Sequence, residues 1–271
     1  MTRPLVVFSH ANGFPAGSYR KLFDELSQTA DIIAPDMLGH DPAWPVDDNW
    51  GNLASELLAF IRARADRPVY GVGHSLGAMV TFFAAYREPQ RFRGIVMLDP
   101  PVINGLGAYS FQLLKWLGRA DPLTPAGKSR FRRTSWPSRE AALADLARKK
   151  LFAAFDPDCL RDYVESGTEP GGEGVQLRYR LPVELAGFRT TPSNPHRFLR
   201  PLRVPGLLLT GEQSDVALPA HIARLHRRHR LLHRVVPGGH LFPLEQPLAT
   251  ARHVAKQLQD WERARMSEVP A

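Results

Sequence analysis

The sequence predicts an α/β fold whose core is a doubly wound, mostly parallel sheet of about six strands, with an inserted α-helical cap. Short, near-continuous apolar runs recur along the chain, as in parallel strands that are buried on both faces. Longer amphipathic segments alternate with these runs, which indicates right-handed strand–helix–strand crossovers. The alternation fails over residues 101–200 and resumes afterwards. This failure predicts that a separate block is inserted into the core.

The predicted strands are six short segments: residues 5–9, 32–34, 69–72, 95–98, 206–210 and 232–236. The helices between them are predicted at residues 17–28, 50–64, 76–86, 219–230 and 246–263. In the second of these helices, Leu53, Leu57 and Ile61 repeat on one face, as in a helix that packs on a sheet. We expect residues 1–100 and 201–271 to form the core together.

The inserted block, residues 101–200, is predicted to be a helical cap. Helical patterns cover residues 110–117, 138–155 and 157–166. Segments rich in Pro and Gly separate them, such as Glu169-Pro170-Gly171-Gly172, and no strand period is evident. Because the block follows a core strand, we expect it to lie over the carboxyl ends of the strands.

Composition indicates a globular protein with a substantial core. A chain of 271 residues with 44% hydrophobic and 23% charged residues fits one large α/β domain with a modest insertion. The single cysteine, Cys159, rules out an internal disulfide and suits a reducing compartment. The apolar stretch near the N-terminus is too short for a secretion signal, and no run approaches the roughly 20 apolar residues that span a bilayer. We therefore expect a cytoplasmic protein without integral membrane contact.

The formal net charge of +8 raises the question of a nucleic-acid partner. The basic residues are mostly arginines, dispersed over the predicted helices, with local clusters at residues 130–133 and 224–230. No nucleic-acid motif accompanies them. A solvated basic surface is therefore favoured over a nucleic-acid site, with attraction to anionic substrates or lipid headgroups as the alternative.

The most informative motif is Gly73-His74-Ser75-Leu76-Gly77. The apolar stretch before it favours a strand, and the long apolar stretch after it, residues 78–86, favours a buried helix. Gly-x-Ser-x-Gly between a strand and a helix is typical of a nucleophile elbow, in which a sharp turn forces the serine into a strained conformation. The flanking glycines let the strand and the helix approach without Cβ clashes. Ser75 is therefore the candidate nucleophile.

The order of elements and these motifs resemble the α/β-hydrolase superfamily over nearly the whole chain. Two cap segments, Val175-Gln176-Leu177-Arg178 and Pro182-Val183-Glu184, are similar to segments of bacterial esterase- or lipase-like members. The family's N-terminal antiparallel hairpin has no counterpart, so we expect about six strands rather than eight. The resemblance implies catalytic residues in the chain order Ser, Asp or Glu, His.

The resemblance places the general base after the last strand, where Val236-Pro237-Gly238-Gly239-His240 ends in a histidine. His240 is the candidate base, which Ser75 needs because a hydroxyl is a poor nucleophile at neutral pH. The acid is expected after the preceding strand, where the family's usual Gly-Glu-x-Asp carries one extra residue and ends at Asp215. Asp215 is favoured over Glu212. Asp99 is a rival, because some members carry the acid after the earlier strand.

Two backbone N–H groups are expected to form an oxyanion hole. One belongs to Leu76, at the start of the helix after the nucleophile. The other belongs to loop 9–15, which resembles the family's oxyanion loop, with Ala11 at the usual glycine position. Asn12 is favoured over Ala11 as this donor. His10 is expected to pack the loop rather than to act as a second base.

The sequence therefore predicts a serine hydrolase that cleaves small-molecule carboxylic esters, as a carboxylesterase or short-chain lipase. Thioester, lactone or carbon–carbon bond hydrolysis, and non-catalytic ligand binding, stay open because the pocket decides between them. Oligomeric state also stays open. No cofactor is implied, and no metal site is expected among His221, His226, His229 and His233, which lie among arginines. Aromatic residues are expected either to line an acyl pocket or to pack the cap on the core: Phe111, Trp116, Phe131, Trp136 and Tyr163.

Overall fold

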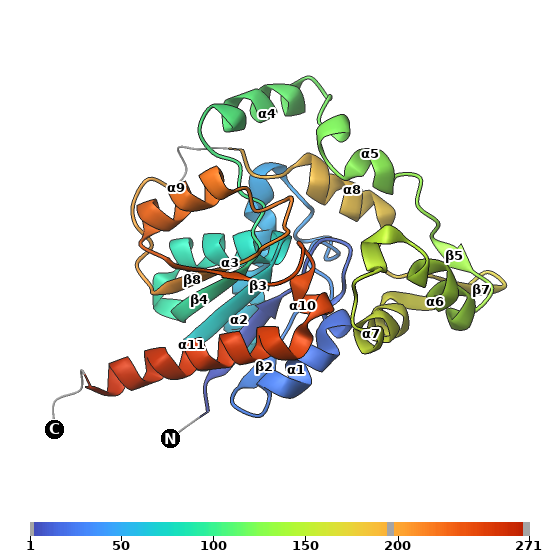
Figure 1. Cartoon of the computed structure of the whole chain (residues 1–271). Coiled ribbons are helices and arrows are strands. Elements are labelled where there is room, and N and C mark those ends of the chain that lie inside the picture. Colours follow the sequence, from blue (N-terminus) through green and yellow to red (C-terminus); the bar gives the residue numbers. More distant parts are fainter. Residues whose placement is uncertain (1–2, 194–197, 268–271) are drawn as a thin grey trace.

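Six parallel strands form a central sheet in the order β2-β1-β3-β4-β8-β9 (Figure 1). The computed structural model describes residues 3–193 and 198–267. The strand bounds are β1 Leu5–Ser9, β2 Asp31–Ile33, β3 Val69–His74, β4 Phe92–Leu98, β8 Gly206–Gly211 and β9 Leu232–Val236. All neighbouring strands of this sheet pair in parallel. The predicted fold class is confirmed, and each predicted strand overlaps an observed one.

Helices cover both faces of this sheet, because its strands are apolar on both sides. Val6 and Phe8 pack in one core cluster with residues of α1 and α11, whereas Val7 packs in the other with residues of α2, α3 and α9. The side chains of Val6, Val7 and Phe8 are fully buried. The helix bounds are α1 Arg20–Leu26, α2 Gly51–Arg64, α3 Leu76–Arg87, α9 Pro219–His229, α10 Phe242–Glu245 and α11 Pro247–Ser267. Short 3-10 helices occupy Ala16–Tyr19, Asp48–Trp50, Pro89–Arg91, Asp121–Leu123 and Lys150–Phe152.

The strand order determines where a site can form. Strand β1 has β2 on one side and β3 on the other, so the chain leaves β1 and β3 in opposite directions along the sheet. Such a reversal opens a crevice at the carboxyl ends of the two strands. Ser9 and Gly73 are register partners at this edge, so the loop after β1 and the turn after β3 lie next to each other.

Residues 101–200, called here the inserted segment, come between β4 and β8 in the sequence, and the described part of this segment lies outside the main sheet (Figure 1). Its helices are α4 Leu106–Trp116, α5 Ala126–Ser129, α6 Arg139–Ala147, α7 Pro157–Gly167 and α8 Leu181–Arg189. It also holds a small antiparallel sheet in the order β5-β7-β6, formed by β5 Ser135–Trp136, β7 Gly174–Leu177 and β6 Thr168–Gly171.

The prediction that the inserted segment lacks strands is wrong. The Pro- and Gly-rich stretch 169–172 is the turn end of the β6–β7 hairpin, not a break between helices. Gly172 at this turn has a φ of 58°, a conformation that glycine adopts without steric cost. Strands of two to four residues are too short to show an alternating pattern in the sequence.

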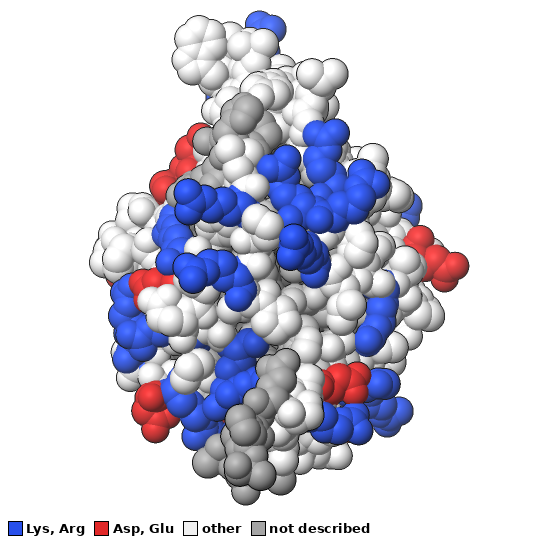
Figure 2. All heavy atoms as spheres, turned by 90° about the vertical axis from the view of Figure 1, so that its left-hand side faces the viewer, with Lys and Arg blue, Asp and Glu red and all other residues white. Residues whose placement is uncertain are grey.

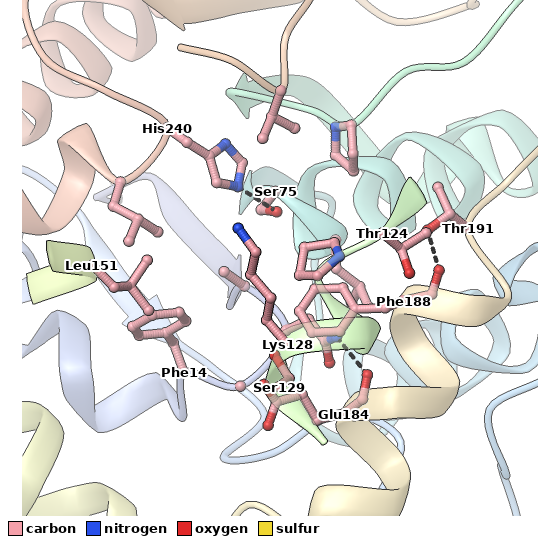
Figure 3. A pocket seen from close by; sticks show the side chains of 18 of the residues that line it. Phe14, Ser75, Thr124, Lys128, Ser129, Leu151, Glu184, Phe188, Thr191 and His240 are labelled. Carbon is pink, nitrogen blue, oxygen red and sulfur yellow. Dashed lines mark hydrogen bonds between the residues drawn. The ribbon is translucent and has the colours of Figure 1, made fainter. Parts of the chain in front are cut away.

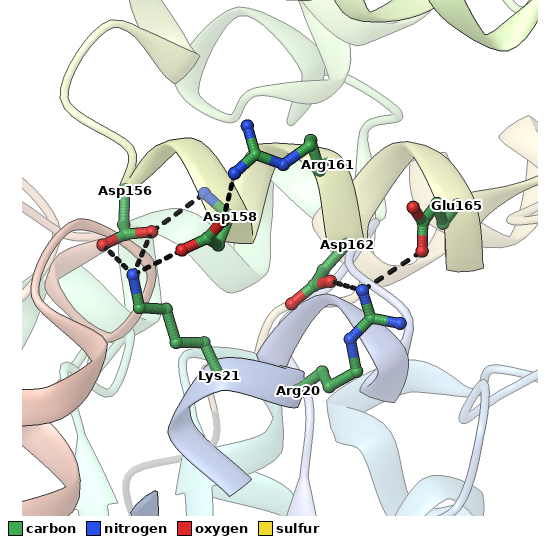
Figure 4. A network of polar contacts seen from close by, with 7 residues as sticks. All are labelled: Arg20, Lys21, Asp156, Asp158, Arg161, Asp162 and Glu165. Atoms are coloured by element: carbon green, nitrogen blue, oxygen red, sulfur yellow. Dashed lines mark hydrogen bonds and ion pairs between the residues drawn. The ribbon is translucent and has the colours of Figure 1, made fainter. Parts of the chain in front are cut away.

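Ion pairs fasten the inserted segment to the core between α7 and α1 (Figure 4). Lys21 Nζ lies 2.8 Å from Asp156 Oδ2 and 2.7 Å from Asp158 Oδ2. Arg20 pairs with Glu165 at 3.1 Å and also with Asp162, whose side chain is nearly buried. These contacts join two helices that are more than a hundred residues apart in the sequence. They therefore fasten α7 of the inserted segment to the core.

The side of the molecule that carries α9 is basic. Figure 2 shows that Lys and Arg predominate over Asp and Glu there. The arginines of the predicted cluster at 224–230 are all exposed: Arg224, Arg227, Arg228 and Arg230. No helix in the described ranges combines the length and the apolar character needed to cross a membrane.

The turn after β2, residues 36–41, is a structural element that supports this edge of the sheet. The N–H of Leu38 donates to His10 Nε2 at 2.7 Å, and the N–H of Gly39 donates to Glu56 Oε2 at 2.7 Å. Gly39 has a φ of 79°, which a residue with a side chain would adopt only under strain. Burial raises the pKa of Glu56 to about 7, although the hydrogen bond from Gly39 opposes this shift.

Substitution Glu56→Gln is expected to stabilise the protein more at pH 8 than at pH 5. The folded protein holds the Glu56 proton up to about pH 7, whereas the unfolded chain releases it near pH 4.5, so folding stability falls as pH rises between these values. Glutamine keeps the acceptor for Gly39 and removes the ionisation. Urea unfolding at both pH values tests this, with Glu173→Gln at an exposed site as the control. A gain that is equal at pH 5 and pH 8 would contradict it.

Candidate active site

Ser75 occupies a sharp turn between β3 and α3. Its φ of 54° and ψ of −119° lie in a region that residues with side chains rarely adopt. A Cβ atom on Gly77 would clash with the carbonyl oxygen of Ser9, and one on Gly73 would clash with the carbonyl of Gly77. The two glycines are thus required by close backbone approach, as the motif predicts. The turn is fixed further by a 2.9 Å hydrogen bond from the Ser75 N–H to the carbonyl of Leu98.

His240 lies in the loop between β9 and α10, with its imidazole between a hydroxyl and a carboxylate. Its Nε2 is 2.9 Å from Ser75 Oγ (Figure 3), and its Nδ1 is 2.6 Å from Asp99 Oδ2. Asp99 only accepts as a carboxylate, so Nδ1 carries the proton and Nε2 is free to accept the one from Ser75. The structure therefore brings together the two residues that the sequence predicted as nucleophile and base.

The carboxylate beside His240 belongs to Asp99, so the prediction that Asp215 occupies this place is wrong. Asp99 follows β4 and is fully buried, with a φ of 46°. Its Oδ1 accepts the N–H of Gly211 at 2.8 Å, and its Oδ2 accepts the hydroxyl of Ser214 at 2.5 Å. Because β4 and β8 are adjacent, the loops after both strands reach the same histidine. The loop after β8 supplies hydrogen-bond donors to Asp99, whereas Asp215 is exposed and is not the carboxylate that accepts from His240 Nδ1.

The expected oxyanion donors lie on either side of Ser75. The N–H of Leu76 is the first of α3 and has no partner within the helix. Among the described residues, no backbone acceptor takes the N–H of Asn12, whereas the N–H of Ala11 donates to Tyr19 Oη at 3.2 Å. The Asn12 side chain is held from the inserted segment, because its Nδ2 donates to the carbonyl of Glu184 at 2.9 Å. This anchoring role was not foreseen from the sequence.

Comparison with known proteins agrees with this geometry. A family model described as the alpha/beta hydrolase family matches residues 6–253. The chain belongs to this family. Among solved structures, it is similar to E-2-(acetamidomethylene)succinate hydrolase, with a TM-score of 0.77 and 24% identity over 95% of this chain and 92% of that one. A peroxisomal α/β-hydrolase of Saccharomyces cerevisiae gives a TM-score of 0.74 at 15% identity, covering 100% of this chain and 80% of that one.

Curated relatives are similar at low identity. A type I acyl-CoA thioesterase of Penicillium roqueforti is 26% identical over 223 residues, which is 73% of this chain and 49% of that protein. The chain thus spans about half the length of that relative. The 2-(acetamidomethylene)succinate hydrolase of Mesorhizobium japonicum is 26% identical over 240 residues, which is 87% of this chain and 81% of that protein.

In this α/β hydrolase, His74 ties three parts of the site together. It is fully buried, and burial, together with the nearby His240, lowers its pKa to about 3, so it is neutral. Its Nε2 lies 2.9 Å from the carbonyl oxygen of His240, which only accepts, so Nε2 carries the proton. Its Nδ1 therefore accepts from Tyr19 Oη at 2.7 Å, and Tyr19 in turn accepts the N–H of Ala11. The loops that carry Asn12 and His240 are thus connected through the residue before Ser75.

His10 packs the loop after β1, as expected from the sequence. It is fully buried, and burial lowers its pKa to about 4. Its Nδ1 is 2.9 Å from the carbonyl of Ala11, and its Nε2 accepts the N–H of Leu38. Both ring nitrogens are engaged by backbone groups, so His10 holds the loop and is not placed as a base.

A cavity of about 550 Å³ opens above Ser75, between the carboxyl edge of the sheet and the inserted segment. Ser75, His240, Asn12 and Leu76 line its floor, and most of the remaining lining is apolar. Of the aromatic residues expected there, three line the cavity: Phe111, Trp136 and Tyr163. Trp116 and Phe131 do not; they are 80% and 76% exposed on the surface. The spacing of apolar residues in the sequence did not show which face of each segment points into the cavity.

Substitution Tyr19→Phe is expected to lower the free energy of unfolding by roughly 2–4 kcal/mol, because it leaves two buried polar groups, His74 Nδ1 and the Ala11 N–H, without partners. Denaturant unfolding monitored by circular dichroism measures this change. The phenyl ring retains the contact with Phe8, so loss of packing contributes little. A free energy of unfolding within about 0.5 kcal/mol of the wild type would show that the network is not stabilising.

Proposed function

We propose that this α/β hydrolase is a serine hydrolase that cleaves carboxylic esters, with Ser75 as nucleophile, His240 as base and Asp99 as acid. The observation that carries the proposal is the line of two hydrogen bonds from Ser75 Oγ to His240 Nε2 and from His240 Nδ1 to Asp99. A nucleophile, a base and an orienting acid in this arrangement are the parts that acyl transfer through serine requires.

The proposed reaction has two steps. His240 Nε2 takes the proton of Ser75 while the oxygen attacks the ester carbonyl, and the imidazolium then gives this proton to the departing alcohol oxygen. A water molecule, activated by the same nitrogen, then hydrolyses the acyl-enzyme and releases the carboxylic acid product. In both steps the backbone N–H groups of Leu76 and Asn12 would donate to the oxyanion, and each such donor contributes about 3 kcal/mol to transition-state stabilisation.

Asp99 is suited to stabilise the imidazolium that forms in each step. It accepts hydrogen bonds from the Gly211 N–H, the Ser214 hydroxyl and His240 Nδ1, which hold the carboxylate in one orientation. Its complete burial removes competing water. A fixed negative charge in a dry site acts strongly on a positive charge that develops beside it.

A thioester is the second candidate substrate. The observation that favours it is the similarity to proteins described as acyl-CoA thioesterases, which carry 26% and 27% identity to this chain over half or less of their own length. The same three residues would cleave a thioester by the same steps, since only the leaving atom changes. A comparison of kcat/KM for matched oxygen esters and thioesters of one acyl group decides between the two.

We infer that the protein acts in a reducing compartment, the cytoplasm. Cys159 is a free, fully buried thiol, and burial raises its pKa to about 12. Such a thiol is unreactive and contributes as a small apolar side chain of the core. With a single cysteine, the chain forms no internal disulfide.

Substitution Ser75→Ala is expected to reduce turnover of 4-nitrophenyl butyrate by several orders of magnitude, because it removes the nucleophile. It is also expected to abolish covalent labelling by a fluorophosphonate probe, which mass spectrometry places on the wild-type peptide. Ser129→Ala is the matched control, since Ser129 also lines the cavity. Undiminished labelling of the Ser75 variant would refute the assignment of the nucleophile.

A parallel pair of variants tests whether Asp99 or Asp215 is the catalytic acid. Asp99→Asn is expected to lower kcat by about 10³–10⁴, because the amide disfavours the required imidazole tautomer. Asp215→Asn is expected to change kcat by less than about threefold, in line with an exposed surface residue. Steady-state kinetics on one neutral ester measures both. The opposite order of effects would return the acid role to Asp215.

A further inference from the structure

Lys128 projects into the cavity toward the reacting groups. It lies on α5 of the inserted segment, and Figure 3 shows its side chain pointing across the cavity toward Ser75 and His240. The lysine thus approaches from the side opposite to the sheet that carries the nucleophile. A flexible four-carbon stem along apolar walls leaves its ammonium group free to meet a ligand.

The other cations of the cavity wall are already engaged. Arg132 Nη2 lies 2.5 Å from Glu184 Oε2, an ion pair that is largely buried. Lys149 Nζ lies 3.1 Å from Asp145 Oδ2. The Nε of Arg133 donates to the carbonyl of Ser135 at 2.7 Å, and its guanidinium lies over the ring of Trp136.

Lys128 is the exception. Within the described residues, no carboxylate oxygen lies within 4 Å of its Nζ, and it donates no hydrogen bond there. Lys128 is exposed to solvent. An ammonium group without a counter-ion at a mostly apolar cavity attracts a negative charge to that place.

We propose that the substrate of this site carries a carboxylate near its ester group, and that Lys128 binds this carboxylate. The inference rests on the proposed ester hydrolysis and names its substrate class. A single ammonium is a compact point charge and matches one negative charge, whereas a phosphate would need further donors. Arg132 already has a counter-ion, because its Nη2 pairs with Glu184 Oε2.

The alternative is that Lys128 acts on the reaction itself, by stabilising the oxyanion of any ester. The two roles differ in what they change. A group that binds a substrate carboxylate raises kcat/KM only for esters that carry one, mainly through KM. A group that stabilises the oxyanion raises kcat for charged and neutral esters alike.

The test compares two esters of equal acyl length, the neutral 4-nitrophenyl hexanoate and the anionic mono-4-nitrophenyl adipate, on four forms of the full chain. The wild type is expected to prefer the adipate by about tenfold or more in kcat/KM, which corresponds to about 1.4 kcal/mol. Lys128→Met is expected to remove this preference through a higher KM for the adipate. Lys128→Arg is expected to retain most of it. Lys149→Met is the matched control, because Lys149 lines the same cavity but pairs with Asp145.

Several outcomes would overturn the proposal. They are a wild type that shows no preference for the adipate, a Lys128→Met variant that keeps the preference, and an equal loss of kcat on both esters. Rising salt is expected to weaken the preference in the wild type, since the attraction is between charges that water reaches. Failure to hydrolyse either ester, together with no fluorophosphonate labelling of Ser75, would instead refute the proposed function.

Discussion

The site depends on one strained turn. At Ser75 the chain changes from strand to helix in a single residue, and the conformation persists because Gly73 and Gly77 admit neighbouring backbone at very short range. The turn points consecutive residues in different directions. Ser75 faces the cavity and the imidazole of His240, while His74 faces the core and holds the carbonyl of that same residue. One backbone geometry therefore positions the proposed nucleophile and supports the loop of the proposed base.

The inserted segment contributes to the site as well as covering it. Its helix α8 holds the side chain of Asn12, whose backbone N–H is an expected oxyanion donor. Its helix α7 is fastened to α1 by ion pairs around Lys21 and Arg20. Because these contacts lie at separate places, the segment is held to the core at more than one point. The cavity wall that carries Lys128 therefore has a defined position relative to Ser75.

Three histidines near the cavity have different roles. His10 and His74 are kept neutral by burial, which lowers the pKa of each, and both hold backbone groups in place. His240 differs because a carboxylate contacts one of its ring nitrogens and a hydroxyl contacts the other. The same side chain thus serves as a structural link or as a candidate base, depending on whether its partners are backbone groups or ionisable side chains.

The sequence by itself determined the six parallel strands, the elbow at Ser75 and the loop of His240. These follow from local patterns, because a buried parallel strand is a continuous apolar run and the elbow is a five-residue motif. Only the tertiary structure decided that Asp99, and not Asp215, contacts His240. The carboxyl ends of β4 and β8 are neighbours, so both loops reach His240, and the loop that supplies the carboxylate depends on the packing of two adjacent strands. The β5-β7-β6 sheet and the inward direction of Lys128 likewise could not be predicted from local sequence patterns, since both depend on contacts between distant segments.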